Sequence, residues 1–104
     1  MGRSLEGMPV LVTGGGSGIG EAVVHRLVKA GARVTLAGRR AEKVEAVARR
    51  AGSGACGVVG DVTVAADRER MVARAVEHGG GLEAVVHAAA NMYRGPLEEL
   101  DERK

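Results

Sequence analysis

Aromatic residues are almost absent from this sequence, which has one Tyr and no Phe or Trp among its 104 residues. Hydrophobic residues still make up 45% of the chain, and most of them are Ala and Val. Small and β-branched side chains of this kind are typical of a buried parallel sheet with helices packed closely against it. Together with 27% charged residues, this composition predicts a folded globular domain and excludes a disordered chain.

Cysteine is nearly absent as well. Cys56 is the single cysteine, and the three His residues are dispersed along the chain. One thiol excludes a disulfide framework, and no Cys and His cluster has the spacing of a zinc site. We therefore expect no metal.

Long apolar runs are also lacking. No stretch approaches membrane-spanning length, and the N-terminal MGRSLEGM lacks the apolar region of a signal peptide. The net charge is only +2, and Arg residues are scattered without aromatic residues between them, which argues against a nucleic-acid surface. The expectation is a cytoplasmic protein with no membrane or nucleic-acid partner.

What the sequence does contain is an alternation of short apolar runs and longer amphipathic segments from Pro9 onward. This alternation predicts an α/β fold, a Rossmann-type doubly wound parallel sheet with partial strand order 3-2-1-4 and helices on both faces. We expect a single domain over residues 1–104, incomplete at its C-terminal sheet edge. The expected strands are Val10–Val12, Arg33–Ala37, Cys56–Val59 and Leu82–His87.

Three helices are expected between these strands, each with an apolar face at three- and four-residue spacing. The first ends at Gly31, and its face consists of Ile19, Val23, Val24, Leu27 and Val28. The second ends at Gly52, and its face consists of Val44, Val47, Ala48 and Ala51. The third has Thr63 as a candidate N-cap, and its buried stripe consists of Val72, Ala75 and Val76.

A glycine-rich turn follows the first expected strand, with five glycines in the seven residues Gly14–Gly20. A tight strand-to-helix turn at this place directs backbone N–H groups and the positive end of the helix dipole at one point, which suits a phosphate. A P-loop is excluded because Glu21-Ala22 follows the last glycine, where Lys and Ser or Thr are required. The spacing Gly-x-Gly-x-x-Gly is not matched either. The pattern that remains is Thr13-Gly14-x-x-x-Gly18-x-Gly20.

This pattern resembles the cofactor turn of the short-chain dehydrogenase/reductase family. Two further segments agree: Gly60-Asp61-Val62 resembles the family's acidic step after strand three, and His87-Ala88-Ala89-Ala90 resembles its Asn-Asn-Ala-Gly segment after strand four. The resemblance extends from Pro9 to Lys104 and implies an NAD(P)-dependent oxidoreductase. It also implies dinucleotide contacts at Thr13, Gly14, Ser17, Gly18, Ile19, Gly20, Asp61, Val62, Ala88, Ala89 and Ala90.

Two positions depart from the family pattern, because His87 replaces an Asn and Ala90 replaces the Gly. The family's Asn ties central strands together, and His87 is expected to do the same. A catalytic role for His87 is the alternative. Ala90 adds a methyl group close to the cofactor ribose and is expected to shift affinity without abolishing binding.

The end of the second expected strand distinguishes the two nicotinamide dinucleotides, because an acidic side chain there binds the ribose 2′-hydroxyl and repels a 2′-phosphate. Here Gly38 is followed by Arg39 and Arg40, whose guanidinium groups suit a phosphate. We expect NADP rather than NAD, with Arg39 as the chief partner. Arg40 either assists or begins a solvated helix. Ser17 stands where many NADP-preferring members carry a second basic residue.

The family's proton-transfer groups, a Ser and a Tyr four residues before a Lys, are not found. The only tyrosine is Tyr93, and Leu97 stands four residues after it. No catalytic residue is therefore assigned. Two interpretations stay open: a truncated cofactor-binding half of an NADP-dependent oxidoreductase, or a non-catalytic dinucleotide-binding module that acts with a partner chain. A homo-oligomer or a complementing chain is a possible partner.

Overall fold

Four parallel strands form the sheet of this protein, in the order β3-β2-β1-β4. The computed structural model describes residues 4–16 and 18–88. The strands are β1 (Pro9–Thr13), β2 (Arg33–Gly38), β3 (Ala55–Val59) and β4 (Ala84–His87). Pairing brings Thr13 opposite Ala37 on one side and His87 on the other. The predicted order is confirmed, and the carboxyl ends of the strands meet at one edge.

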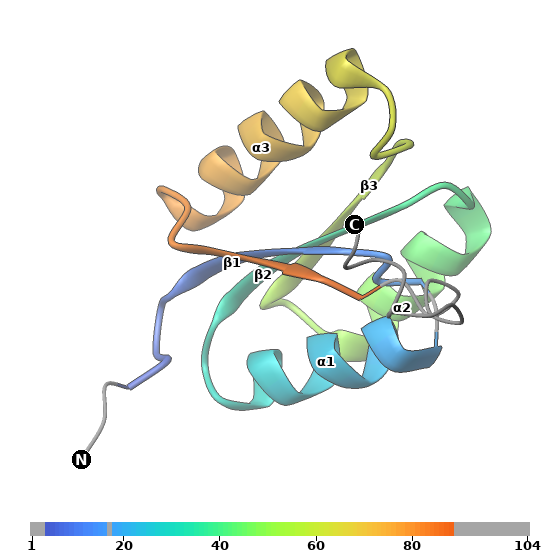
Figure 1. The fold of residues 1–104 in the computed structure, drawn as a ribbon. Coiled ribbons are helices and arrows are strands. Elements are labelled where there is room, and N and C mark those ends of the chain that lie inside the picture. Colours follow the sequence, from blue (N-terminus) through green and yellow to red (C-terminus); the bar gives the residue numbers. More distant parts are fainter. Residues whose placement is uncertain (1–3, 17, 89–104) are drawn as a thin grey trace, which may run out of the picture.

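Three helices connect the strands: α1 (Gly18–Lys29), α2 (Ala41–Ala51) and α3 (Ala65–Gly79). Figure 1 shows α1 and α2 on one face of the sheet and α3 on the other. The crossovers through α1 and α2 each lead to a neighbouring parallel strand, whereas α3 carries the chain from β3 at one edge to β4 at the other. Because all four strands are parallel, each helix begins at their carboxyl edge. This arrangement places the glycine turn before α1 beside the turn before α2.

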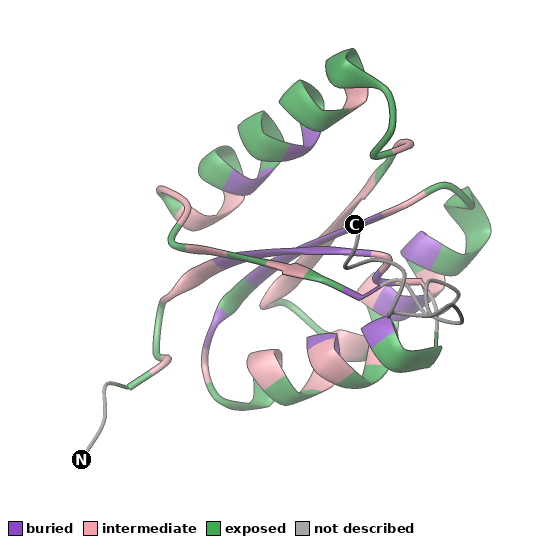
Figure 2. Cartoon of the chain, viewed as in Figure 1, coloured by how far each residue is buried: buried purple, intermediate pink, exposed green. Residues whose placement is uncertain are grey.

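The core has two layers, one on each face of the sheet (Figure 2). On the face of α1 and α2, Val12, Val24 and Val44 are at most 1% exposed. On the face of α3, Leu11 and Ala37 pack with Met71 and Ala75. Period-two alternation along β1 explains why Leu11 and Val12 belong to different layers.

The first two helices follow the sequence prediction with one exception. Val24 is buried, and Val23, Leu27 and Val28 pack partly buried against the core. Ile19 was expected on this face but is 57% exposed. It lies in the first turn of α1, directly after the glycine turn.

The third helix follows its prediction only in part, since Ala75 is buried as predicted but Val72 and Val76 are not. Met71 and Ala75 face the sheet, whereas Val72 and Val76 are 42% and 44% exposed. Both pairs have four-residue spacing, so each pair lies on one face of the helix. The two faces are one residue apart, which is a rotation of about 100° around the helix axis. The predicted N-cap was also wrong, because α3 is preceded by Val64 without a side-chain cap. Thr63 instead bonds to Asp61.

Candidate dinucleotide site

The glycine turn is fixed to the end of β2 by two backbone hydrogen bonds. The N–H groups of Gly14 and Gly15 both donate to the carbonyl oxygen of Ala37, at 2.8 and 3.1 Å. Gly14 has a φ of 76°, which side chains other than glycine rarely adopt, so the chain reverses sharply after β1. The turn therefore brings the N-terminus of α1 to the carboxyl edge of the sheet, with its positive dipole end at that edge.

The remaining glycines of the turn differ in whether packing requires them to lack a side chain. A Cβ at Gly15 would lie 2.6 Å from Leu36 Cβ, and one at Gly20 would lie 2.0 Å from the Gly14 oxygen. These two glycines are required by packing within the protein. A Cβ at Gly18 would meet nothing within 4 Å, so this glycine borders open space at the start of α1. Packing among the described residues therefore does not require a glycine at this position.

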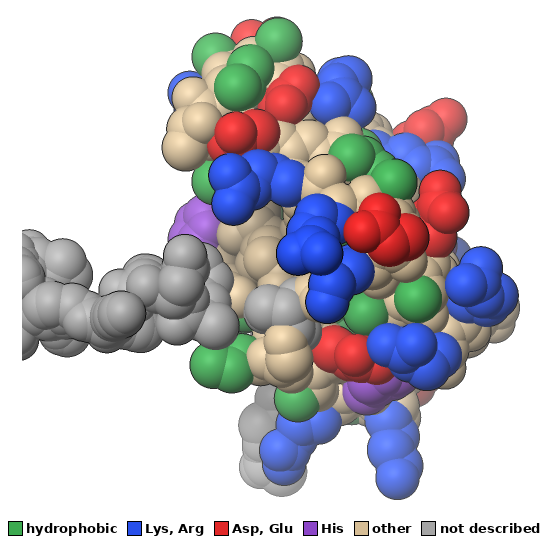
Figure 3. Space-filling view, turned by 90° about the vertical axis from the view of Figure 1, so that its right-hand side faces the viewer, with side chains coloured by type: hydrophobic (Ala, Val, Ile, Leu, Met, Phe, Trp, Pro, Cys, Tyr) green, Lys and Arg blue, Asp and Glu red, His purple; other side chains and the backbone are tan. Residues whose placement is uncertain are grey.

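A cavity of about 240 Å³ opens between the glycine turn and the start of α2. Arg39, Arg40 and Lys43 supply three basic side chains to its wall, and the described residues that line it include no Asp or Glu. The other lining residues are Gly14, Gly16, Gly38 and Val44. Figure 3 faces this edge of the molecule and shows Lys and Arg side chains gathered near its centre. The cavity suits an anion held by backbone on one side and by cations on the other.

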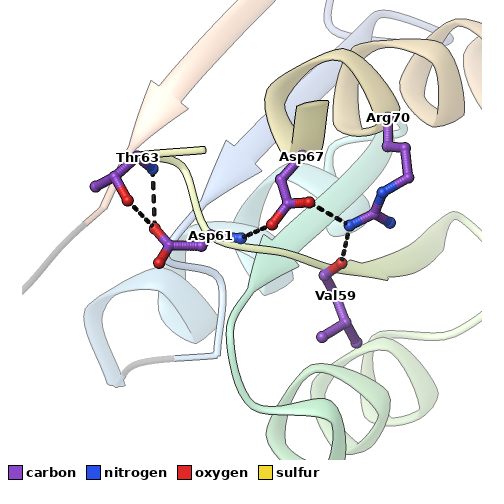
Figure 4. Close-up of polar contacts among 5 residues, drawn as sticks. All are labelled: Val59, Asp61, Thr63, Asp67 and Arg70. Atoms are coloured by element: carbon purple, nitrogen blue, oxygen red, sulfur yellow. Dashed lines mark hydrogen bonds and ion pairs between the residues drawn. The ribbon is translucent and has the colours of Figure 1, made fainter. Parts of the chain in front are cut away.

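Asp61 follows β3 at the same edge, in a loop ordered by its own carboxylate (Figure 4). Asp61 Oδ1 accepts hydrogen bonds from the Thr63 N–H at 2.9 Å and the Thr63 hydroxyl at 2.7 Å. This is an Asx-type turn, which aspartate forms readily. It explains why Thr63 is used inside the loop and is not the helix cap.

The backbone of Asp61 is held by a residue that the sequence did not point out. Asp67, in the first turn of α3, accepts the Asp61 N–H at 2.8 Å. Arg70 then donates to Asp67 Oδ1 and to the Val59 carbonyl oxygen, both at 2.9 Å (Figure 4). This chain of contacts ties the end of β3 to α3 on both sides of Gly60.

The hydrogen bonds lower the pKa of both carboxylates. For Asp61 the largest cause is the Thr63 hydroxyl, with the Thr63 N–H next and the charge of Arg39 a smaller contribution. For Asp67 it is the Asp61 N–H, followed by Arg70. Both groups are therefore ionised at neutral pH, and Asp61 is an acceptor rather than a donor toward any ligand at this edge.

Thr13 and His87 occupy the carboxyl ends of the neighbouring strands β1 and β4. Thr13 Oγ1 lies 2.8 Å from His87 Nδ1, and the Ala88 N–H donates to the Thr13 carbonyl oxygen at 2.8 Å. His87 thus connects its own strand to β1, as expected, although β4 is an edge strand of the described sheet. Ala88, which is 6% exposed, packs in the core cluster of the α1 and α2 face.

Glu21, whose position argued against a P-loop, connects α1 to α2. Its carboxylate accepts two hydrogen bonds from Arg50, both at 2.9 Å, and lies 3.0 Å from His25 Nε2. These contacts, with His25 the largest cause, lower the pKa of Glu21. Glu21 therefore has a structural explanation, because its carboxylate contacts His25 of α1 and Arg50 of α2.

Most of the predicted site residues meet at the carboxyl edge. Gly14, Arg39 and Arg40 line one cavity. Gly18 and Ile19 begin α1, and Asp61 follows β3, at the same edge. The predicted positions Ser17, Ala89 and Ala90, like Tyr93, lie outside the described residues. Sequence reasoning missed Lys43 and Asp67. Within residues 4–16 and 18–88 no cluster of potential metal ligands is present, and no helix there is long and apolar enough to cross a membrane.

The comparisons with known proteins agree on one family. A short chain dehydrogenase family model matches residues 9–104. Cis-1,2-dihydrobenzene-1,2-diol dehydrogenase of Pseudomonas putida is 44% identical over 82 residues, which is 79% of this chain and 30% of that protein. The human protein named dehydrogenase/reductase SDR family member 2, mitochondrial, is 43% identical over 82 residues, 76% of this chain and 29% of its own length. The chain thus spans about a third of the length of the curated relatives it matches.

Solved structures share the fold. The crystal structure of 3-ketoacyl-(acyl-carrier-protein) reductase from Brucella melitensis, complexed with NADH, superposes with a TM-score of 0.76 at 36% sequence identity. The match covers 79% of this chain and 34% of that one. With the strand order, the glycine turn and the family-model match taken together, the chain belongs to the short chain dehydrogenase family and has its Rossmann-type, NAD(P)-binding fold.

Proposed function

We propose that this chain binds NADP(H) at the carboxyl edge of its sheet, as the dinucleotide-binding part of an NADP-dependent oxidoreductase. The observation that carries the proposal is the cavity between the glycine turn and α2. Among residues 4–16 and 18–88, those in its wall include Arg39 and Arg40 and no carboxylate, and Gly38 stands where an acidic residue would select NAD. A dianionic 2′-phosphate fits such a wall, because guanidinium groups form charge-assisted, bidentate hydrogen bonds with phosphate oxygens.

The rest of the dinucleotide is assigned to the neighbouring turns. The pyrophosphate belongs at the N-terminus of α1, against Gly18, Ile19 and Gly20. The exposed Ile19 offers an apolar surface there. The adenine belongs against the Asp61 and Val62 loop, where the ionised Asp61 carboxylate accepts a hydrogen bond. Thr13 and Ala88 shape the ends of β1 and β4 beneath the cofactor.

When bound, NADP(H) supplies hydride transfer between its nicotinamide ring and a carbonyl or alcohol substrate. This chain's residues are assigned to binding and orienting the dinucleotide. Proton transfer is not assigned to them, since Leu97 stands four residues after Tyr93 in place of Lys. We therefore expect the chain to bind the dinucleotide without turnover of its own.

Binding of both dinucleotides to wild type and to Arg39→Ala tests the proposal by isothermal titration calorimetry. Wild type is expected to bind NADPH more tightly than NADH. Loss of a hydrogen bond to a charged group costs about 1.5–3 kcal/mol, so Arg39→Ala should weaken NADPH about tenfold or more and leave NADH nearly unchanged. An unaltered preference for NADPH in Arg39→Ala would show that this side chain does not bind the 2′-phosphate.

Arg40→Ala is the matched comparison on the next residue. Arg40 lies 3.7 Å from Glu42 in an exposed ion pair, so its contribution to phosphate binding is expected to be smaller than that of Arg39.

Consumption of NADPH with a panel of ketones tests whether the chain has turnover of its own. Turnover by this chain alone would contradict the expectation that it binds the dinucleotide without catalysing the reaction.

A further inference from the structure

Lys43 joins the two predicted arginines in the wall of the cavity between the glycine turn and α2. It lies in the first turn of α2, three residues after Arg40, and is exposed. From the sequence alone this lysine belongs to the solvated face of an amphipathic helix. The fold instead places it against the glycine turn of a different segment.

Its neighbours fix the base of this side chain. A Cβ at Gly16 would lie 3.2 Å from Lys43 Cβ, so the helix and the glycine turn are in contact at this point. The next residue, Val44, is 1% exposed and anchors α2 in the core. The Lys43 N–H donates to the Arg40 carbonyl oxygen at 3.1 Å. Only the outer methylenes and the ammonium group are therefore free to turn toward the cavity.

The three basic residues differ in whether a carboxylate lies near them. Arg40 is paired with Glu42, and Arg39 is close enough to Asp61 to lower the pKa of that carboxyl group. Within the part of the chain that the structure describes, Lys43 has no carboxylate within ion-pair distance. A cation in the first turn of a helix is also opposed by the helix dipole, and an anion bound between these residues relieves this repulsion.

We propose that Lys43 is a third phosphate-binding residue and determines specificity for the 2′-phosphate of NADP(H), an inference that rests on the proposed function. Lys43 approaches the anion from α2, while Arg39 approaches it from the end of β2. The ammonium group acts as a mobile point charge beside the planar guanidinium.

The test compares 2′,5′-ADP (adenosine 2′,5′-bisphosphate) with 5′-AMP, which differs only in lacking the 2′-phosphate, by calorimetry on wild type, Lys43→Gln and Lys43→Arg. Lys43→Gln should weaken 2′,5′-ADP about tenfold or more, as expected for the loss of a charge-assisted hydrogen bond, and change 5′-AMP less than about twofold. Lys43→Arg should retain most of the affinity. Arg49→Gln is the matched control, since it removes one positive charge from the outer face of the same helix.

The possible failures are distinct. Equal losses for both ligands in Lys43→Gln, or an equal loss in Arg49→Gln, would overturn the specific role and indicate a general effect of charge or structure. A wild-type preference for 2′,5′-ADP that Lys43→Gln retains would overturn this inference and leave the proposed function intact. Wild type without any preference would overturn both. Thermal unfolding of each variant establishes that the compared chains are folded.

Discussion

Thr13 and His87 are register partners on β1 and β4, and their side chains meet with 2.8 Å between Thr13 Oγ1 and His87 Nδ1. Thr13 is 7% exposed and His87 is exposed, so the contact is only partly buried. It lies at the point where β4, an edge strand among the described residues, ends beside the glycine turn. The pair therefore couples the shape of the turn to the docking of β4.

A double-mutant cycle on Thr13→Val and His87→Ala should reveal this coupling. An intramolecular hydrogen bond contributes about 0.5–1.5 kcal/mol, and we expect an interaction energy in that range from urea unfolding. Thr13→Ser retains the hydroxyl and should retain the coupling with His87. Strictly additive effects of Thr13→Val and His87→Ala would contradict a stabilising role for the contact.

The glycine turn offers a matched pair of alanine substitutions. Gly20→Ala places a Cβ 2.0 Å from the Gly14 oxygen, and overpacking against backbone of this kind costs about 1–3 kcal/mol or more. Gly18→Ala meets nothing within 4 Å and should leave the free energy of unfolding unchanged or slightly raised. We expect Gly18→Ala to weaken NADPH binding in calorimetry, because its methyl group occupies the approach to the start of α1. Unimpaired binding by Gly18→Ala would remove Gly18 from the site.

Acid should destabilise the chain through Asp61, Asp67 and Glu21. Each has a lowered pKa in the folded state, so the folded chain binds fewer protons than the unfolded chain in the acid range. Their stabilisation is present above the ordinary carboxyl pKa of about 4 and is lost as the pH falls through the lowered values. The midpoint of urea unfolding should therefore fall when the pH is lowered from about 6 to about 3.

Asp67→Asn tests the part of this effect that belongs to the β3–α3 loop. The variant should be less stable than wild type at neutral pH and should lose less stability on acidification. Glu69→Gln is the control, because Glu69 is exposed on the same helix and forms no ion pair within the described residues. Identical dependence of stability on pH in wild type and Asp67→Asn would show that the negative charge of Asp67 does not contribute to the loss of stability in acid.

The sequence was sufficient to predict the sheet order, since alternating segments and short connections leave few topologies for parallel strands. It was insufficient for the buried face of α3, where Ala75 was predicted correctly but Met71 is buried in place of Val72 and Val76. Met71 and Ala75 have the same four-residue spacing as Val72 and Val76, so spacing alone does not distinguish the two faces. Lys43 and Asp67 were missed for a related reason. In the sequence, each reads as an ordinary charged residue on the solvent-exposed face of a helix. Their contacts with Gly16 and Asp61 arise only when the helix packs against a neighbouring loop.

Gly38, the last residue of β2, should control which dinucleotide is preferred. A Cβ there would lie 3.0 Å from Val44 Cγ2, so Gly38→Ala requires a small shift of α2 and is expected to weaken NADPH and NADH alike. Gly38→Asp adds a carboxylate beside Arg39, which repels a 2′-phosphate and accepts a hydrogen bond from a 2′-hydroxyl. The ratio of NADPH to NADH affinity, measured by calorimetry, should therefore fall at least about tenfold in Gly38→Asp relative to Gly38→Ala. The comparison with Gly38→Ala removes the steric contribution, because both variants carry the same Cβ. If both variants have the same ratio, the end of β2 does not contact the 2′-position, and the cavity beside Arg39 must hold another part of the ligand.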